Sequence, residues 1–125
     1  MITPHLQEVH PVLPVRDVVT SIGFYVHSLG FTLAFADDPK DPKYAGVRRD
    51  GVEVHLQWHS EQEWEDMTAS SLRFVTTQIE RLFETYANAG VYHQNTDLRV
   101  TTWGTREFGF FDPDRNGLTF YENLT

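Results

Sequence analysis

The sequence predicts an α+β domain made of two βαβββ modules, because the same pattern occurs twice along the chain. Asp17 precedes an amphipathic run of twelve residues that stops at Gly30. Thr77, sixty positions later, precedes a second run of twelve residues that stops at Gly90. A strand-like segment comes before each run, and aromatic and β-branched segments separated by turns come after it. Helices on one side of the sheets give an α+β fold, and the seam between two such modules is where we expect a ligand cavity.

The ends of the first helix carry clear local signals. Asp17 can accept a hydrogen bond from a free N–H of the first turn, and Gly30 can adopt the left-handed conformation that stops a helix. Before the helix, a period of two predicts a strand, and two prolines within it favour an edge position. After the helix, Asp50-Gly51 predicts a hairpin turn, because glycine accepts positive φ. The expected elements are strands over residues 9–15, 31–36, 44–49 and 52–58, a helix over 18–29 and an exposed loop over 37–43.

The second module repeats this order after an acidic, irregular linker over residues 60–68. Thr77 and Glu80 fit a capping box, in which the hydroxyl binds one free N–H and the carboxylate another. Gly90 again ends the helix. The expected elements are strands over residues 71–76, 98–103, 105–111 and 118–121 and a helix over 78–89. Both modules belong to one domain, residues 1–125, with the first module over about 6–59 and the second over about 69–123.

Composition narrows the classes of function. Eighteen acidic against ten basic residues give a net charge of −8, which argues against nucleic acid and favours a cationic ligand, besides promoting solubility. A chain without cysteine has no disulfide, no thiolate zinc site and no cysteine nucleophile. No apolar run is long enough for a bilayer and no signal peptide is recognisable, so we expect a cytoplasmic protein without membrane contact. The sequence also contains no phosphate loop, no serine-hydrolase elbow and no His-Glu-x-x-His helix.

Strand alternation separates the residues that face the helices from those that face the expected cavity. On the strand over residues 52–58, Glu53 and His55 face away from the helices. His10 takes the same side of the first strand. In the second module, the expected cavity-facing residues are Ser71, Arg73, Thr119 and Tyr121.

Several short runs occur in a characteristic order and spacing over about residues 8–122. They are HPVLPVRD (10–17), FY (24–25), LGF (29–31), DGVEVHL (50–56), WGTREF (103–108), DPDRNG (112–117) and YE (121–122). The first three runs resemble the vicinal oxygen chelate superfamily, which contains glyoxalase, extradiol dioxygenases, fosfomycin-resistance enzymes and bleomycin-resistance proteins. The remaining four look most like the bleomycin-resistance branch. The resemblance implies paired βαβββ modules that form a curved mixed sheet around a cleft, completed in a homodimer, with the paired modules coming from one chain or exchanged between subunits.

Metal-dependent members of this superfamily carry ligands on the first, fourth, fifth and eighth strands. Carried over to this sequence, those positions are His10, His55, Ser71 and Thr119. Neutral hydroxyls bind divalent ions weakly, and a catalytic metal usually has three strong protein ligands. We therefore expect no metal, no cofactor and no catalytic residue, and interpret His10 and His55 as side chains that line the cavity.

The resemblance to the bleomycin-resistance branch implies that the protein sequesters a cationic, planar-ended glycopeptide antibiotic without chemical turnover. Aromatic faces would stack on the planar end, and carboxylates would attract the positive tail. Trp64 is expected to be exposed. Trp103 is as often a core residue as a ligand contact, and a tryptophan such as Trp58 is more often a core residue. The candidate ligand-binding residues are His10, Phe35, Asp37, Glu53, His55, Trp58, Trp64, Trp103, Glu107 and Tyr121.

Two alternatives remain open from the sequence. One is a metal-dependent lyase, dioxygenase or transferase that uses His10 and His55, with Glu107 as a third candidate ligand. The other is a sensor or self-protection protein for a different antibiotic, because one scaffold can serve many sites.

Overall fold

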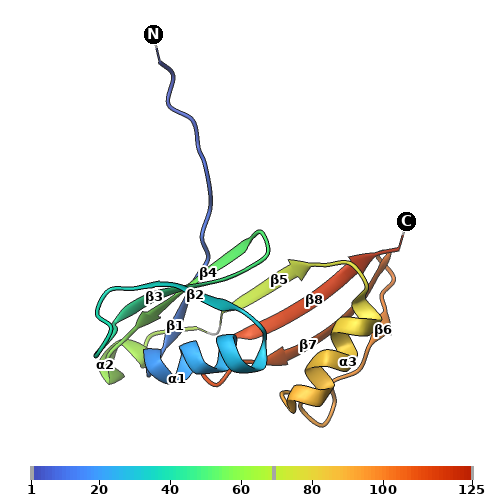
Figure 1. The fold of residues 1–125 in the computed structure, drawn as a ribbon. Helices are drawn as coiled ribbons and strands as arrows, with labels where there is room; N and C mark the ends of the chain where they lie inside the picture. The colour runs from blue at the N-terminus through green and yellow to red at the C-terminus, as the bar shows by residue number, and fades with distance from the viewer. Residues whose placement is uncertain (1, 69, 125) are drawn as a thin grey trace.

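The computed structural model describes residues 2–68 and 70–124 and confirms an α+β fold with two four-stranded mixed sheets. Each sheet has the same order of strands, first-fourth-third-second within its module, and in each the first and fourth strands are parallel. The expected single curved sheet is thus resolved into sheet A in the first module and sheet B in the second (Figure 1). Ala69, the expected first residue of the second module, lies outside the described residues.

The elements follow the predicted order, with the linker between the two modules. Sheet A and its helices comprise β1 (Val12–Val15), α1 (Val18–Gly23), the π-helix η1 (Phe24–Ser28), β2 (Thr32–Ala36), β3 (Tyr44–Arg49) and β4 (Val52–Trp58). The linker contains α2 (Glu61–Trp64). Sheet B and its helix comprise β5 (Ser71–Val75), α3 (Ile79–Ala89), β6 (Arg99–Val100), β7 (Thr105–Phe111) and β8 (Gly117–Asn123). α1 contacts β3 and β4, and α3 contacts β7 and β8. No helix in the described part of the chain is long and apolar enough to cross a bilayer.

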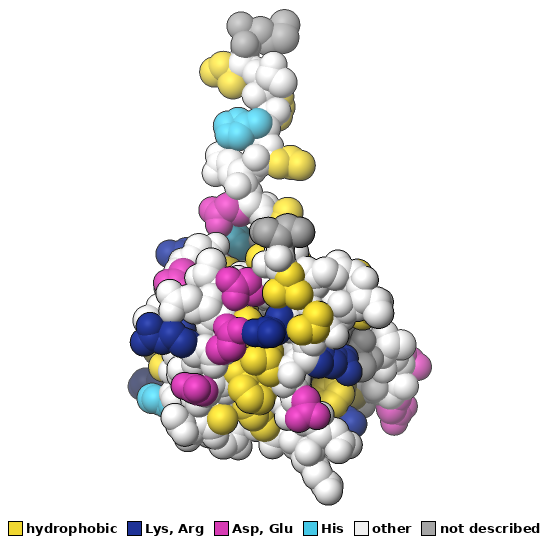
Figure 2. All heavy atoms as spheres, turned by 90° about the vertical axis from the view of Figure 1, so that its right-hand side faces the viewer, with side chains coloured by type: hydrophobic (Ala, Val, Ile, Leu, Met, Phe, Trp, Pro, Cys, Tyr) yellow, Lys and Arg dark blue, Asp and Glu magenta, His cyan; other side chains and the backbone are white. Residues whose placement is uncertain are grey.

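The first strand is shorter than predicted and begins at Val12. Residues before it extend away from the body of the molecule, and Val9 is 87% exposed (Figure 1). Pro11 explains the later start, because proline cannot donate to a strand ladder, whereas Pro14 lies within β1. Pro11 contributes only its carbonyl, which accepts a hydrogen bond from the His55 N–H at 2.9 Å. On the face shown in Figure 2, this segment projects from a surface on which acidic, basic and hydrophobic side chains are interspersed.

The first helix begins as predicted and changes its hydrogen bonding halfway. The Asp17 carboxylate accepts the Thr20 N–H at 3.0 Å, which confirms the N-cap. From Phe24 the chain forms a π-helical turn, in which the Leu29 N–H bonds the Phe24 carbonyl at 3.3 Å. Gly30 follows with φ of 80°, so the predicted left-handed stop is also confirmed.

The predicted capping box of the second helix is wrong. The N-cap residue is Gln78, which has φ of 53° and makes no side-chain capping bond. The first N–H of α3, that of Ile79, instead donates to the Glu122 carboxylate of β8 at 3.1 Å. A carboxylate from a distant strand therefore replaces the local cap, which sequence spacing alone does not reveal. Gly90 ends the helix with φ of 73°, as predicted.

Two turns differ in detail from the predictions. The linker was expected to be irregular, but Ser60 and Glu63 form a capping box and open the short helix α2. In the β3–β4 hairpin, the positive φ of 53° falls on Asp50 rather than on Gly51. Aspartate tolerates the left-handed region better than most residues with a side chain, and both strands keep their predicted bounds.

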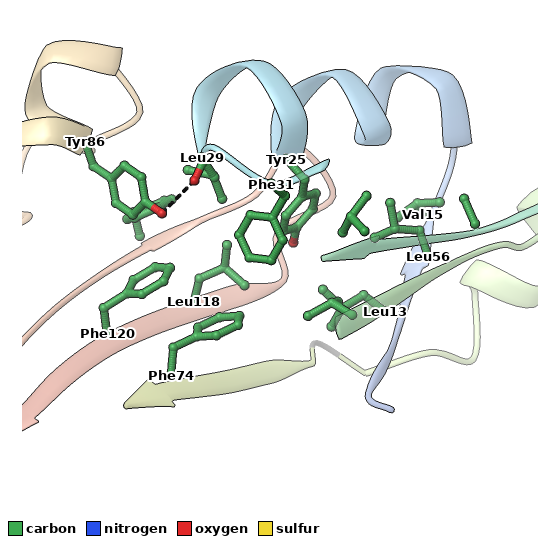
Figure 3. Packing of buried hydrophobic residues seen from close by; sticks show 14 of the residues in the cluster. Leu13, Val15, Tyr25, Leu29, Phe31, Leu56, Phe74, Tyr86, Leu118 and Phe120 are labelled. Carbon is green, nitrogen blue, oxygen red and sulfur yellow. Dashed lines mark hydrogen bonds between the residues drawn. The ribbon is translucent and has the colours of Figure 1, made fainter. Parts of the chain in front are cut away.

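One hydrophobic core runs through both modules and joins them (Figure 3). Phe31 of the first module packs edge to face with Phe74 of the second, with ring centroids 6.4 Å apart. The Tyr86 hydroxyl of α3 donates to the Leu29 carbonyl at 2.9 Å, across the same boundary. The relative orientation of the sheets is thus set by shared packing.

A buried polar network also connects the modules. Asp112, at the β7–β8 turn, accepts the Tyr25 hydroxyl at 2.9 Å and the Asn116 side-chain amide at 3.0 Å. The same amide of Asn116 donates to the Pro14 carbonyl of β1 at 3.0 Å. Each buried partner is hydrogen-bonded, as burial of polar groups requires. The turn of the second module is therefore inserted into the first.

Candidate functional site

The helix-free face of sheet A carries a group of polar and aromatic side chains, here called the sheet A group: His10, Phe35, Tyr44, Glu53 and His55. Val54 and Leu56 of β4 are fully buried, and alternation turns Glu53 and His55 to the opposite side, as predicted. His55 Nε2 lies 2.7 Å from the Glu53 carboxylate, and His55 Nδ1 lies 2.7 Å from the Tyr44 hydroxyl. The imidazole is thus fixed from both ends.

The aromatic members of the group form a continuous surface. The rings of His10 and His55 are stacked with centroids 4.5 Å apart, and Phe35 meets His55 edge to face at 5.2 Å. Phe35 lies directly over Gly46, where an added Cβ would sit 2.8 Å from Phe35 Cδ1. Only glycine at position 46 allows the ring to lie there. Phe35 remains 41% exposed, so a flat aromatic face is open to a ligand.

Glu53 is the anionic centre of the sheet A group. His55 and Arg48 donate hydrogen bonds to its carboxylate, and His10 Nε2 lies 3.5 Å away. These contacts, that of His55 foremost and then that of Arg48, hold the pKa of Glu53 below its ordinary value. Glu53 is therefore ionised at neutral pH and surrounded by hydrogen-bond donors, among them the cationic Arg48 guanidinium.

Sheet B carries a second group on its helix-free face, here called the sheet B group: Arg73, Thr105, Glu107 and Tyr121. Glu107 is only 4% exposed and accepts hydrogen bonds from Arg73 and from the Thr105 hydroxyl, both at 2.9 Å. The bond from Arg73 is the main cause of the lowered pKa of Glu107. The Arg73 guanidinium also lies 4.4 Å from the centre of the Tyr121 ring. The carboxylate on this sheet is thus buried and paired with an arginine.

Six of the ten candidate residues belong to these two groups. His10, Phe35, Glu53 and His55 are in the sheet A group, and Glu107 and Tyr121 are in the sheet B group. Tyr44 and Arg73 are functional candidates that were not among the ten, although Arg73 was expected to face the cavity. Alternation along β3 places Tyr44 on the same face as Gly46, and alternation along β5 places Arg73 on the expected face, so both positions had a sequence signal. Only the structure shows the bonds that they make.

The tryptophans and Asp37 lie elsewhere. Trp58 has the same parity on β4 as Val54 and Leu56, so it is on the helix side, with the Lys43 ammonium 4.5 Å from its ring centre. Alternation applied to the last residue of the strand would have placed it on that side. Trp103 is 65% exposed in the turn before β7. Asp37 accepts the N–H groups of Lys43 and Tyr44 and closes the β2–β3 loop, which lowers its pKa.

The expected exposure of Trp64 is wrong. The ring is half-buried, because the Arg16 guanidinium lies 4.0 Å from its centre and covers one face. Its indole N–H is buried without a hydrogen-bond partner among the described residues. Trp64 therefore helps hold the linker against the first module, and its part in ligand binding stays a prediction.

Comparison with known proteins confirms the family that the sequence resembles. The sequence profile of the Glyoxalase/Bleomycin resistance protein/Dioxygenase superfamily matches residues 7–120. The chain belongs to this superfamily. A bleomycin resistance protein from Geobacillus stearothermophilus is 30% identical over 91% of this chain and 95% of its own length, and one from Staphylococcus aureus shows the same figures.

Solved structures of the superfamily share the fold. The bleomycin-binding protein from bleomycin-producing Streptomyces verticillus, complexed with copper(II)-bleomycin, is 28% identical, with a TM-score of 0.72, and the match covers 94% of this chain and 97% of that protein. A bleomycin resistance determinant encoded on transposon Tn5 has a TM-score of 0.80, with coverage of 96% and 100%. Its sequence identity of 18% shows similarity of fold alone.

The metal positions of the superfamily are only partly kept in this chain. Ser71 and Thr119 lie on sheet B and offer hydroxyls, and the Glu107 carboxylate is taken by Arg73 and Thr105. A different trio does have suitable spacing. Ligand atoms of His10, Glu53 and His55 all lie within 4.8 Å of one another, the one such group among residues 2–68 and 70–124. Two imidazoles and a carboxylate are a donor set that suits zinc and other divalent ions.

Proposed function

We propose that this chain binds a bleomycin-type antibiotic, a cationic glycopeptide with a planar aromatic end, and holds it without chemical change. The observation that carries the proposal is the relative from Streptomyces verticillus, which is 28% identical and was solved with copper(II)-bleomycin. The 30% identical bleomycin resistance proteins support the same ligand class. A net charge of −8 favours a cationic ligand over an anionic one.

The sheet A group supplies the contacts that such a ligand needs. The exposed ring of Phe35, supported by His55 and His10, offers a flat face for the planar end. Glu53 offers negative charge beside that face for a positive group. Binding without turnover agrees with the state of the carboxylates. Glu53 and Glu107 both have lowered pKa values, which makes them weak general bases at neutral pH.

The proposal includes a homodimer in the cytoplasm. In the part of the chain that the structure describes, no helix covers the sheet A group or the sheet B group, so each module presents an open face. Pairing of two copies would set the sheet A group of one protomer opposite the sheet B group of its partner and enclose the ligand. Light scattering at micromolar concentration tests this part directly, because a monomer at concentrations where ligand binds would remove it.

Calorimetric titration with metal-free and copper-loaded bleomycin tests the ligand. We expect saturable binding, and recovery of intact antibiotic by mass spectrometry after overnight incubation. Loss of an aromatic stack costs roughly 0.5–1.5 kcal/mol, so Phe35→Ala should weaken binding roughly twofold to twelvefold. Trp58→Phe is the matched control, because Trp58 lies on the other face of β4. If neither form of bleomycin binds, the proposed ligand class is refuted. If another cationic aromatic antibiotic binds in its place, that antibiotic replaces bleomycin as the ligand.

A second candidate function is a metal-dependent reaction, favoured by the spacing of His10, Glu53 and His55. A bound divalent ion would supply Lewis acidity, and the two imidazoles with the Glu53 carboxylate would hold it. Protein purified without chelators should then contain one equivalent of metal, and His55→Ala should lose it while far-UV circular dichroism stays unchanged. Metal-free protein that still binds bleomycin with full affinity would reject this candidate.

A further inference from the structure

A cavity of about 240 Å³ lies between the two modules on the helix side of the sheets, apart from the sheet A and sheet B groups. Alternation along β3 separates the two regions. Arg48 points to the helix-free face and binds Glu53, whereas Arg49 points to the helix side and reaches α3. The lining residues are Phe31, Arg49, Asp50, Gly51, Val52, Phe74, Val75, Thr76, Leu82, Tyr86 and Phe120. This cavity is therefore distinct from the proposed antibiotic site.

The floor of the cavity is aromatic and rigid. Phe74 and Phe120 are stacked with ring centroids 4.7 Å apart, and Phe31 meets Phe74 edge to face. Tyr86 packs against Phe120 at 5.3 Å (Figure 3). All four side chains are buried in the shared core, so their positions are fixed before any ligand enters. Such a floor suits a small flat apolar body.

Arg49 places a cation at the rim of this apolar cavity. Its Nη1 donates to the Leu29 carbonyl at 2.7 Å and to the Tyr86 hydroxyl at 2.8 Å, which fixes the guanidinium plane. Its Nε and Nη2 have no hydrogen-bond partner among the described residues. A guanidinium edge with two parallel N–H donors matches the two oxygens of a carboxylate.

Asp50 is the nearest competing anion. A carboxylate oxygen of Asp50 lies 3.9 Å from Arg49 Nε, beyond hydrogen-bonding distance, and this side chain is 91% exposed. An anion so well solvated screens Arg49 only weakly. Asp50 should therefore lower the affinity of an acidic ligand without blocking the site.

We propose that this cavity binds a small aromatic monocarboxylate. The ring lies on Phe74 and Phe120, and the carboxylate accepts hydrogen bonds from Nε and Nη2 of Arg49. The volume is below the roughly 300–1,000 Å³ that is usual for drug-sized ligands, so a single or fused pair of rings is the appropriate size. The ligand bridges the modules, because Arg49 belongs to sheet A and both phenylalanines to sheet B.

The first test compares acids with their neutral amides on the unmodified protein. Phenylacetate and indole-3-acetate are titrated into ¹⁵N-labelled protein, each against the corresponding acetamide. We expect the acids to shift the amide signals of Gly51 and Thr76 and the Nε–H signal of Arg49, with saturation. The signal of His55 on the other face should stay in place. The amides should bind at least about tenfold more weakly, because they lose a charge-assisted pair of hydrogen bonds.

Two variants with opposite expected signs complete the test. Arg49→Gln should weaken binding of the acids roughly tenfold or more, and Asp50→Asn should strengthen it roughly 1.5-fold to fivefold by removing the competing charge. Asparagine tolerates the left-handed φ of position 50, so this change spares the hairpin. Arg81→Gln on α3 is the matched control for loss of a cation and should leave the affinity unchanged.

Several results would overturn the proposal. They are equal affinity for acids and amides, signal shifts confined to the sheet A group, or an Asp50→Asn variant that binds the acids no better. If Arg49→Gln fails to fold, the acid–amide comparison and the Asp50→Asn variant still decide the matter. Because bleomycin binds elsewhere in our proposal, saturation with phenylacetate should not displace it, and failure of either site leaves the other testable.

Discussion

Replacing Tyr25 by phenylalanine removes one hydroxyl from the buried network that joins the modules. That hydroxyl donates to the Asp112 carboxylate at 2.9 Å, and both residues are buried. After the change, the affected oxygen of Asp112 keeps only the Asn116 amide as a partner. The ring itself is unchanged, so the packing of Tyr25 in the π-helical turn should be preserved.

The expected loss in the free energy of unfolding is about 1.5–3 kcal/mol, the range for a hydrogen bond to a charged group. For a chain of 125 residues the entropy of unfolding corresponds to about 4 °C per kcal/mol, which predicts a fall in the melting temperature of about 6–12 °C. Urea unfolding followed by circular dichroism measures the free energy, and calorimetry measures the melting temperature.

Tyr92→Phe is the matched control, because the Tyr92 hydroxyl donates to the neutral carbonyl of Phe83. We expect it to cost about 0.5–1.5 kcal/mol. In an Asp112→Asn background, the cost of Tyr25→Phe should shrink toward the same value, since the acceptor is no longer charged. A loss for Tyr25→Phe no larger than that for Tyr92→Phe, or one unaltered by Asp112→Asn, would refute the reasoning.

Three further predictions concern other parts of the molecule. Gly46→Ala should displace the Phe35 ring and weaken bleomycin binding roughly threefold to tenfold in calorimetry, with an unchanged circular dichroism spectrum; unchanged affinity would contradict the aromatic platform. Glu122→Ala should cost about 0.5–2 kcal/mol in urea unfolding, because the Ile79 N–H loses its acceptor, and a neutral result would show that water replaces the cap. The pKa of Glu107 is lower in the folded state than in the unfolded state. The contribution of Glu107 to the free energy of unfolding is therefore present above its unfolded pKa and is lost as the pH falls through its folded pKa. Glu107→Gln should therefore flatten the decline of unfolding free energy below about pH 4.3, and an equally steep decline in both proteins would count against this pair.

Local signals predicted most of the fold correctly. β3, β4 and β7 have the predicted bounds. Asp17 begins the first helix, and Gly30 and Gly90 end the two helices, as expected. These features depend on short-range periodicity and on the backbone preference of single residues. The incorrect predictions concern features that do not depend on short-range signals alone. The cap from Glu122 and the late start of β1 depend on partners far away in sequence or on hydrogen bonds that proline cannot make.

The site shows the same division. Alternation placed His10, Glu53 and His55 on one face, and the structure brings them together. Trp64 was misjudged because an acidic neighbourhood in sequence does not reveal a cation from another element, here Arg16. The cavity beside Arg49 has no sequence signal, because its walls come from strands and a helix of both modules.

The turn at residues 112–116 has a consequence for how the chain acquires its structure. Its bonds to Tyr25 and to Pro14 join residues 87 and 102 positions apart, so they close very long loops. During synthesis the whole first module is made before this turn exists, and until then the Tyr25 hydroxyl and the Pro14 carbonyl lack these partners. Contacts of such long range slow folding and leave apolar surface exposed to aggregation in the meantime. The first module is thus completed only when the second has been made. A shortage of chaperones during expression should therefore lower the folded yield of this protein more than that of a protein whose modules fold independently.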